Sequence, residues 1–508
     1  MRSPIAALAF CGLLAARAAA RNNLSATPPM GFLSWQVFRC DLAAPGDDCT
    51  DPATTRCVSE ALYRGVADAL VASGLAAAGY ATVHLDDCWQ AQTRDAKGAL
   101  AFNATRFPSG GQALARYLHN RGLKFGFYTK FTTVQCPGAV SFPPTQGFEA
   151  VDAASFAAWE VDYLKADACG GYGDIDYARD YRALGAALEA TGREIEYSCS
   201  WPAYMGDDES AKPFGTFITD GCNGWRNWAD VQCSWGSVSS IIDHWGDFCG
   251  VLAPWAGPGH WHDPDMLLAG AKCISIDEER TQMAIWCIVA APLLMGNDPR
   301  NLTDESKAIL LNPFAIAVSQ DGLGQMGLRL QNSSSAPLQT WFRGLADGGV
   351  AVALYNKFGA GPLGPCPPAA WNSTTGGYYD SLPPGSGGAD CFDGLSVAAA
   401  EAACCASYQC AGFSIDASGH GCYKPNSAAG FVANGAFSGY FKRAPPPPSD
   451  GAANITLRFA DVGLYSPRVE VFDIWAQAPV GVFDGGSYTA VGVPLHGSAF
   501  LRLSAAAS

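Results

Sequence analysis

A repeated alternation of short apolar runs and helix-like stretches fills residues 28–325 and constrains the fold more than any other feature. Eight runs read as strands: Met30–Trp35, Ala81–Trp89, Lys124–Tyr128, Val161–Cys169, Glu194–Trp201, Trp225–Val231, Val251–Met266 and Ala291–Asn297. Helical patterns rich in Ala and Leu lie between them, among them Ser59–Ala77, Gly110–Arg121, Ala153–Glu160, Tyr177–Thr191 and Glu278–Val289. Eight strands alternating with helices predict a (β/α)₈ TIM barrel, whose active site forms where the strands end.

Acidic and aromatic residues follow the ends of these predicted strands. They are Trp35, Asp86–Trp89, Lys165–Asp167, Ser200–Trp201, Arg226–Asp230 and Asp263–Met266. Because the carboxyl ends of barrel strands meet at one rim, we expect these side chains to gather there. Carboxylates beside indole rings suit a sugar, so the pattern favours a carbohydrate site.

Two carboxyl groups are needed to hydrolyse a glycoside: one attacks or activates water, and the other protonates the leaving oxygen. Asp167 is the candidate nucleophile, because strand alternation places it on one face with Lys165, whose ammonium favours an ionised carboxylate. Asp230 is the candidate acid, because its flanking tryptophans would desolvate it and raise its pKa. The alternative for both residues is that they cap the helices that follow. The number of carboxylates at one rim favours the catalytic interpretation.

The pattern changes after residue 335, where short strands replace the alternation. The strand candidates are Gly349–Asn356, Ile455–Ala460, Arg468–Ile474, Val480–Phe483 and Phe500–Leu503. Between the first two lies a Gly-, Pro- and Ser-rich stretch with six cysteines. We therefore expect an α/β protein with a catalytic barrel over residues 21–330. An antiparallel β-sandwich over 331–361 and 444–508 should follow, interrupted by a disulfide-rich insert over 362–443.

Residues 1–20 have the features of a cleaved secretory signal peptide: an early arginine, an apolar stretch and a final run of alanines. Of the 19 cysteines, 18 lie beyond it, and disulfides are the expected state of cysteines in a secreted chain. No later window is apolar enough to span a membrane. Six glycosylation sequons begin at Asn23, Asn103, Asn301, Asn332, Asn372 and Asn454. Together these features predict a glycoprotein that is extracellular or delivered to a lysosome or vacuole.

The net charge of −15, from 32 basic and 47 acidic residues, argues against nucleic acid or an anionic membrane as the main partner. The sequence contains no phosphate-binding glycine loop, no metal-ligand cluster and no nicotinamide fingerprint. We therefore expect neither a cofactor nor a metal, and hydrolysis needs only water.

Ten motifs in order resemble the α-galactosidase/α-N-acetylgalactosaminidase family of retaining glycoside hydrolases, family 27. They are Thr27–Trp35, Leu85–Trp89, Arg106–Pro108, Leu164–Asp167, Tyr197–Tyr204, Trp225–Asn227, Ala256–Gly259, Asp263–Met266, Ala291–Met295 and Gln320–Gly324. The resemblance covers nearly the whole chain apart from the signal peptide and the insert. It implies a retaining exo-glycosidase, with Asp167 as nucleophile and Asp230 as acid/base, and family members are often dimers.

The resemblance also implies a set of substrate-binding residues and disulfides. The substrate-binding residues are Trp35, Asp86, Asp87, Tyr128, Lys165, Ser200, Ala203, Tyr204, Arg226 and Asp265. In this set, Asp86 and Asp87 would bind the C4 and C6 hydroxyls, and Trp35 would lie under the sugar. The implied disulfides are Cys40–Cys88, Cys49–Cys57, Cys136–Cys169 and Cys199–Cys222. Cys169 is thus expected to be bridged and not a reactive thiol.

Ser200 and Ala203 stand where α-galactosidases that resemble this chain carry Glu and Leu. The smaller pair leaves room for an N-acetyl group, the pattern of α-N-acetylgalactosaminidases. We therefore expect terminal α-GalNAc to be preferred over α-galactose. The first alternative is an α-galactosidase proper. A more distant one is an inactive sugar-binding protein, although both candidate carboxylates are present.

Several positions depart from the family pattern. Lys130 lies where the family has an acidic, glycine-containing turn, and His262 replaces an Asn before Asp-Pro-Asp. Cys233, Cys249, Cys273 and Cys287 have no family partners. Within the insert, residues 391–443 resemble a PAN/apple-type module, which would bind a glycan or a protein.

Overall fold

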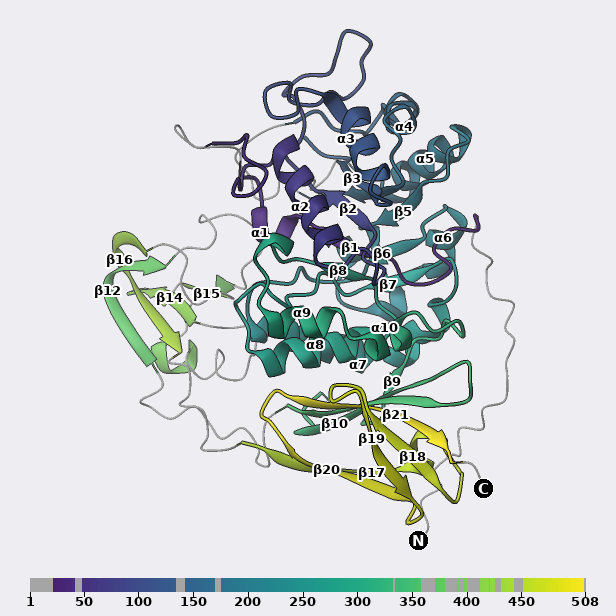
Figure 1. Cartoon of the computed structure of the whole chain (residues 1–508). Helices are drawn as coiled ribbons and strands as arrows, with labels where there is room; N and C mark the ends of the chain where they lie inside the picture. Colours follow the sequence, from purple (N-terminus) through teal and green to yellow (C-terminus); the bar gives the residue numbers. More distant parts are fainter. Residues whose placement is uncertain are drawn as a thin grey trace.

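The structure is a computed structural model of the chain. It describes residues 22–41, 48–133, 142–169, 175–331, 334–357 and 451–506, together with shorter stretches between 371 and 442. The predicted signal peptide, Cys136 and Asn332 lie outside the described residues. Figure 1 shows the (β/α)₈ barrel in purple to green and the C-terminal β-sheets in green and yellow.

Eight parallel strands form the barrel, which confirms the predicted fold. They are β1 (Met30–Leu33), β2 (Thr82–Leu85), β3 (Lys124–Lys130), β4 (Tyr163–Asp167), β5 (Glu196–Cys199), β6 (Gly224–Arg226), β7 (Trp261–Asp263) and β8 (Leu293–Met295). The strands pair in the order β7-β6-β5-β4-β3-β2-β1-β8. A single parallel bridge between Leu267 and Met295 connects the segment after β7 to β8. The sheet is therefore curled into a barrel whose strand ends share one rim.

Helices follow the strands around the outside. The principal ones are α2 (Glu60–Ala72), α3 (Gly110–His119), α4 (Glu149–Ala158), α5 (Tyr177–Ala190), α6 (Phe214–Thr219), α7 (Trp235–Leu252), α8 (Ile276–Ile288), α9 (Asp304–Leu310) and α10 (Pro313–Ser319). Serine side chains cap several of them: Ser59 accepts from the Leu62 amide, and Ser275 forms a capping box with Glu278. Among the described residues, none of the helices is long and apolar enough to cross a membrane.

The predicted strand runs are longer than the strands themselves, and the largest difference is at Val251–Met266. The apolar run Val251–Met266 begins inside the last turn of α7, continues through the 3₁₀ turn Ala253–Trp255, and contains only the short strand β7. An apolar run alone does not distinguish the buried end of a helix from a buried strand, which is why the prediction merged them. Each of the five predicted helical stretches overlaps a helix, although α4 and α8 begin before the predicted residues.

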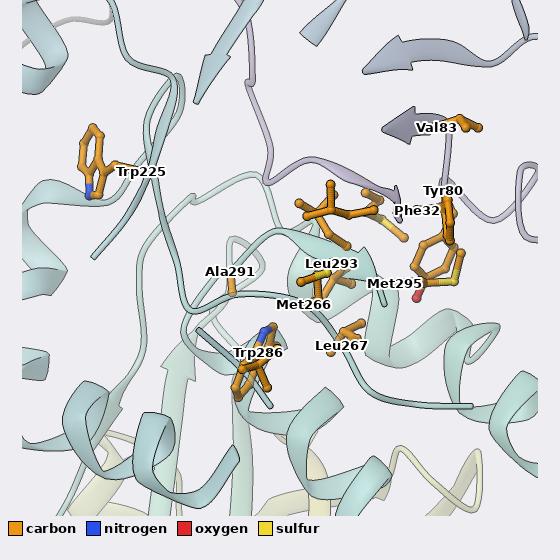
Figure 2. Close-up of a cluster of buried hydrophobic side chains, with 14 of the residues drawn as sticks. Phe32, Tyr80, Val83, Trp225, Met266, Leu267, Trp286, Ala291, Leu293 and Met295 are labelled. Atoms are coloured by element: carbon orange, nitrogen blue, oxygen red, sulfur yellow. The ribbon is translucent and has the colours of Figure 1, made fainter. Parts of the chain in front are cut away.

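A continuous apolar core fills the layer between the barrel strands and the helices that surround them. Figure 2 shows Phe32, Val83, Leu293 and Trp286 within it, and all four are almost completely buried. The indole N–H of Trp286 donates to the carbonyl oxygen of Asp265 at 2.7 Å, so the core directly supports a loop at the rim.

The C-terminal region forms a six-stranded antiparallel sheet and a two-stranded one. The larger sheet has the order β19 (Ala478–Phe483), β18 (Val469–Asp473), β21 (Ser498–Ala505), β11 (Val350–Asn356), β10 (Leu338–Gly344) and β9 (Leu328–Arg329), and the smaller pairs β17 (Ala453–Arg458) with β20 (Ser487–Val493). Strand β9 falls within the residues assigned to the barrel by sequence, but it pairs with β10. Arg343 fastens this region to the barrel, because its buried guanidinium donates to the carbonyls of Cys287 and Val318.

The insert contains an antiparallel five-stranded sheet. Its order is β12 (Trp371–Tyr379), β16 (Phe431–Lys442), β14 (Gly412–Asp416), β15 (Gly421–Lys424) and β13 (Cys391–Phe392). In the ladder between β13 and β15, Cys391 lies opposite Cys422. The sheet includes a strand that precedes residue 391, outside the module expected from sequence. Cys366, Cys404, Cys405 and Cys410 lie outside the described residues, and the PAN/apple-type assignment stays a prediction.

Candidate active site

A pocket lies at the carboxyl ends of the barrel strands. It encloses about 540 Å³, part of which is open to solvent. It is lined by Trp35, Asp86, Tyr128, Lys165, Asp167, Cys169, Ser200, Ala203, Tyr204, Arg226, Asp230 and Met266. Sequence analysis named all of these as site residues except Cys169 and Met266. Two further named residues, Asp87 and Asp265, lie behind the pocket wall and do not line it.

The carboxylate of Asp167 ends strand β4 and is held by three donors. The Tyr128 hydroxyl donates to Oδ2 at 3.0 Å, and the Ala168 amide donates to Oδ1 at 2.7 Å. The Tyr204 hydroxyl donates to the same Oδ1. Burial, reinforced by the charge of Asp167, raises the pKa of both phenols, so each keeps its proton and acts as a donor. Asp167 therefore accepts on both oxygens, as an ionised carboxylate does.

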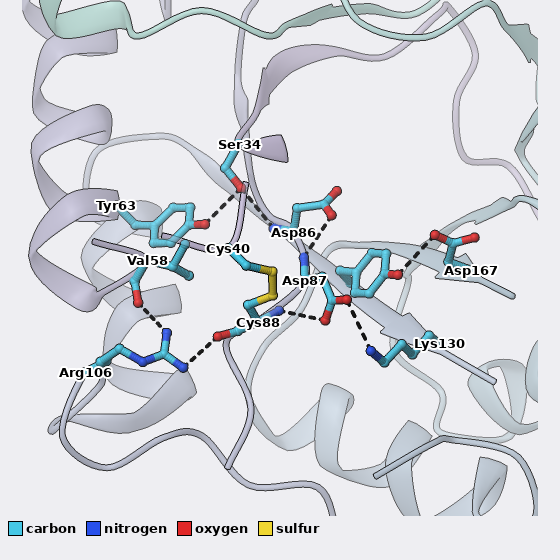
Figure 3. The surroundings of a disulfide bond; sticks show 11 residues. Ser34, Cys40, Val58, Tyr63, Asp86, Asp87, Cys88, Arg106, Lys130 and Asp167 are labelled. Atoms are coloured by element: carbon cyan, nitrogen blue, oxygen red, sulfur yellow. Dashed lines mark hydrogen bonds and ion pairs between the residues drawn. A yellow bond between two sulfur atoms is a disulfide. The ribbon is translucent and has the colours of Figure 1, made fainter. Parts of the chain in front are cut away.

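Asp86 and Asp87 each pair with a different lysine. Figure 3 shows the pair of Asp87 with Lys130. Lys165 Nζ lies 2.8 Å from Asp86 Oδ2, at the pocket surface. Lys130 Nζ lies 3.2 Å from Asp87 Oδ2, and both side chains are fully buried. Burial raises the pKa of Asp87, although the charge of Lys130 opposes the change. Lys130 thus acts as a buried counter-ion of Asp87.

The environment of Asp230 corrects the prediction made from its flanking tryptophans. Its pKa is lowered: partial burial acts to raise it, but the charges of Arg226 and Lys165 and a 2.9 Å bond from Arg226 outweigh that effect. The carboxylate is 62% exposed. Trp225 is fully buried and donates to His262 instead, and Trp228 stacks on His244. The indoles therefore do not supply the apolar surroundings that were expected.

Arg226 also contacts Asp265 behind the pocket wall. Its Nη1 lies 3.2 Å from Asp265 Oδ2, which accepts a second bond from the Val231 amide at 2.8 Å. Asp265 has a φ of 78°, a conformation that non-glycine residues rarely adopt. Its carboxylate thus connects the guanidinium to the loop that carries Asp230.

A buried polar network, which sequence analysis missed, lies behind this loop. Glu209 accepts from Lys212, His244 and Asn227 at 2.8, 2.8 and 3.0 Å. Lys212 also donates to the carbonyl of Asn227, the residue next to Arg226. The only sequence signal was a Glu and a Lys three residues apart in an unassigned loop. The network fixes the backbone at the end of β6.

His262 belongs to this network and does not line the pocket. Trp225 Nε1 has only a proton to offer, so His262 Nδ1 must accept it, at 2.8 Å. The other nitrogen, Nε2, therefore carries the proton and donates to the carbonyl of Leu252 at 2.9 Å. Burial lowers the pKa of His262 to about 4, which keeps the ring neutral. It is a hydrogen-bonded buried residue that joins β6, β7 and the end of α7.

The helix-capping alternative is wrong for both candidate carboxylates. Asp176 caps α5, the helix after Asp167, by accepting from the Arg179 amide. Ser234 caps α7, the helix after Asp230, by accepting from the Ser237 amide. Asp167 and Asp230 are instead directed into the pocket that they line.

Ser200 and Ala203 line the pocket beside Tyr204. They lie at the end of β5 and in the 3₁₀ turn Trp201–Tyr204 that follows it. Ser200 is buried, and its amide donates to the carbonyl of Ala166 at 3.0 Å. This part of the pocket wall carries no charged side chain among the described lining residues.

Disulfides brace the loops around the site. The bridges Cys40–Cys88, Cys49–Cys57 and Cys199–Cys222 are present, and Cys233–Cys273 adds a pairing that sequence analysis left open. Cys169 is disulfide-bonded, whereas the predicted partner Cys136 lies outside the described residues. Cys249 and Cys287 are free thiols. Cys88 adjoins Asp87, so the first bridge lies directly beside the carboxylates of Asp86 and Asp87 (Figure 3).

Comparisons with known proteins agree with this architecture. A family model described as alpha galactosidase A matches residues 27–321, and one for the alpha galactosidase C-terminal beta sandwich domain matches residues 432–503. The α-N-acetylgalactosaminidase of Gallus gallus is 41% identical over 338 residues, which cover 66% of this chain and 80% of that protein. Human α-galactosidase A is 41% identical over 337 residues, covering 66% and 75% of the two chains.

Solved structures show the same similarity. The crystal structure of α-galactosidase I from Mortierella vinacea superposes with a TM-score of 0.66 at 25% identity, covering 96% of this chain and all of that one. The family match extends over more than half of this chain and includes every residue that lines the pocket. The chain therefore belongs to the alpha-galactosidase A family, family 27 of the glycoside hydrolases.

Proposed function

We propose that this glycoside hydrolase removes terminal α-linked N-acetylgalactosamine, and more slowly α-galactose, with retention of configuration. The observation that carries the proposal is the composition of one pocket. It combines two carboxylates in different environments, Asp167 and Asp230, with a wall of small uncharged residues at Ser200 and Ala203.

Asp167 is suited to the role of nucleophile. In the first step one of its oxygens attacks the anomeric carbon and the bond to the glycosidic oxygen breaks. Asp230 gives its proton to that oxygen, so the aglycone leaves as an alcohol. Tyr128 and Tyr204 hold the attacking carboxylate in place, and neither withdraws its charge by proton transfer, because their own pKa values are raised.

In the second step water replaces the aglycone. Asp230, now ionised, takes a proton from the water as its oxygen attacks the anomeric carbon, and the bond to Asp167 breaks. Two inversions at one carbon return the α configuration. Trp35, Asp86 and Lys165 line the part of the pocket in which the sugar ring would be held.

The lowered pKa of Asp230 has a consequence for the pH optimum. In the free enzyme Asp230 must be protonated to act as an acid, and its ion pair with Arg226 favours the ionised form. The competent fraction therefore grows as the pH falls. We infer an optimum in mild acid, which fits a lysosomal, vacuolar or acidic extracellular site. The disulfides agree with such a route through the secretory pathway.

The specificity is tested by comparing kcat/KM for nitrophenyl α-GalNAc and nitrophenyl α-galactoside. Rejection of a substrate that lacks the N-acetyl contact should cost about 1–3 kcal/mol, or roughly 5- to 150-fold. The double variant Ser200→Glu/Ala203→Leu should shift preference towards galactose, because the larger side chains fill the space and add an acceptor for the 2-hydroxyl. A wild-type enzyme that ignores α-GalNAc would leave the α-galactosidase alternative.

The mechanism is tested by following product anomers by NMR during the first minutes of hydrolysis. Retention predicts that the α-anomer appears first and then mutarotates. An initial β-anomer would show inversion, and the proposed covalent intermediate on Asp167 would be wrong.

A further inference from the structure

Arg39 lies at the edge of the pocket in an unusual backbone conformation. It follows the short helix α1 (Trp35–Phe38), and its φ is 47°. This region is disfavoured for a residue with a Cβ atom. The next residue, Cys40, is bridged to Cys88, which keeps this stretch of chain in place. The fold therefore maintains an arginine where a glycine would fit more easily.

The guanidinium of Arg39 spans two loops of the rim. Its Nη2 donates to Gln36 Oε1 at 2.9 Å and lies 3.4 Å from Gln232 Oε1. Its carbon lies 5.3 Å from the ring centroid of Trp35, which lines the pocket. Gln232 is two residues beyond Asp230. Arg39 is thus placed between the aromatic wall of the pocket and the loop of the candidate acid.

Arg39 differs from the other cations of the site in its partners. Lys165, Lys130 and Arg226 are each paired with at least one aspartate. Among the ion pairs of the described residues, Arg39 has none, and its hydrogen-bond partners are neutral amides. Among the described residues, Arg39 therefore makes no direct ion pair with a carboxylate of the site, although its charge acts on Asp230.

The location of Asp230 shows which part of a substrate this charge would meet. An acid that protonates the glycosidic oxygen lies beside the leaving group, and the carboxylate of Asp230 is 62% exposed, towards solvent. The aglycone must therefore leave past the Asp230 loop. The charge of Arg39 reaches this region, where it contributes to the low pKa of Asp230.

We propose that Arg39 is a specificity-determining residue that binds a carboxylate on the aglycone, just beyond the bond that is cleaved. A guanidinium presents two parallel N–H donors to a carboxylate, and Nη1 and Nε are not used in the contacts with Gln36 and Gln232. Acidic glycopeptides and glycans with a uronic or sialic acid next to the terminal sugar carry such a group. The inference rests on the proposed glycosidase function of the same pocket.

The test uses two aryl α-GalNAc substrates that differ only in charge: a carboxyphenyl glycoside and its methyl ester. For each enzyme the ratio of kcat/KM for the acid to that for the ester is measured. Comparing this ratio between enzymes cancels the different leaving-group abilities of the two phenols. Arg39→Gln should lower the ratio by about 3- to 10-fold, mainly through KM of the acid. Arg39→Lys should retain part of the wild-type preference for the acid. In the wild type, 1 M NaCl should remove most of that preference.

The control is Arg116→Gln, which makes the same change in net charge on helix α3, away from the pocket. Its ratio should equal that of the wild type. If Arg39→Gln slows both substrates equally, Arg39 only connects the two loops and the inference is overturned. Equal ratios in the wild type, Arg39→Gln and Arg116→Gln overturn it as well. If the wild type hydrolyses neither the ester nor the acid, the proposed function itself fails, and the inference fails with it.

Discussion

The two sides of the pocket neutralise their carboxylates in different ways. On the side of β2, β3 and β4, each buried aspartate has its own ammonium: Lys165 for Asp86 and Lys130 for Asp87. On the side of β6 and β7, Arg226 serves both Asp230 and Asp265. The charges on the first side therefore form independent ion pairs. On the second side, two aspartates share one guanidinium.

The candidate catalytic residues reflect this difference. Asp167, on the first side, is held by two neutral phenols and a backbone amide, so its charge remains available for attack. Asp230, on the second side, is paired with Arg226, whose charge also interacts with Asp263 and Asp265. The same residue type at two strand ends thus meets different surroundings: neutral donors at Asp167 and a shared guanidinium at Asp230.

The largest effect is expected at Arg226. Arg226→Gln leaves Asp230 and Asp265 without their shared partner. Removing one member of a buried ion pair typically lowers the free energy of unfolding by about 3–5 kcal/mol. Because the guanidinium also holds the Asp230 carboxylate in place at the pocket, we expect kcat/KM to fall by at least ~100-fold. Arg226→Lys keeps the charge but loses the bidentate donor. Its kcat/KM should lie between those of the wild type and Arg226→Gln. A loss under about 5-fold in Arg226→Gln would contradict the idea of a shared cation.

The next effect is expected at Lys130. Lys130→Met leaves Asp87 buried and unpaired, so the free energy of unfolding at pH 7 should fall by about 3–5 kcal/mol. The double variant Lys130→Met/Asp87→Asn removes the stranded charge and should recover a large part of that loss. If the double variant is as unstable as the sum of the two single variants, the two side chains do not act as a pair.

A smaller effect concerns stability against pH. Burial raises the pKa of Asp263 from 3.8 to about 6, with Arg226 opposing the change. Because the folded pKa is the higher one, the stabilisation is complete below the unfolded pKa and is lost as the pH rises through about 6. In the wild type this titration should lower the free energy of unfolding by about 2–3 kcal/mol between pH 4 and 7. Asp263→Asn should remove that decrease.

The control for this experiment is Asp484→Asn, at an exposed position in the C-terminal region. Its pH dependence of unfolding should match that of the wild type. The same curve in Asp263→Asn as in the wild type would show that burial of Asp263 does not shift its titration.

The smallest effect is expected at the phenols of the first side. Tyr128→Phe removes one of the three donors that hold the Asp167 carboxylate in place. The rate should fall about 10-fold, the value of one hydrogen bond to a charged group. Tyr181→Phe is the matched control, because that phenol donates to the Ala166 carbonyl. Equal losses of kcat/KM in both variants would contradict a specific role for Tyr128.

The barrel and its rim could be predicted from the sequence because the signals are local. Parallel strands buried on both faces read as apolar runs, and the residue that ends each run is placed at the rim by the fold alone. Asp167 and Arg226 were found in this way. The same locality explains the error at Val251–Met266, where the end of α7 and a short strand share one apolar run.

The charge states and partners could not be predicted, because they depend on residues far apart in the chain. Asp87 and Lys130 are 43 residues apart, and neither motif indicates that they form a pair. The pKa of Asp230 was expected to rise because Trp225 and Trp228 are its neighbours in sequence, yet their rings pack elsewhere and Arg226 dominates. The Cys233–Cys273 bridge was open for the same reason.

The roles of Asp167 and Asp230 are tested most directly by azide rescue of Asp167→Gly and Asp230→Gly on an activated aryl α-GalNAc. With Asp167 removed, azide must attack from the empty face, and we predict a β-glycosyl azide. With Asp230 removed, the sugar still forms its bond to Asp167, and azide then displaces it to give an α-glycosyl azide. The opposite pair of products, or an α-azide from Asp167→Gly, would contradict the assignment of nucleophile and acid/base.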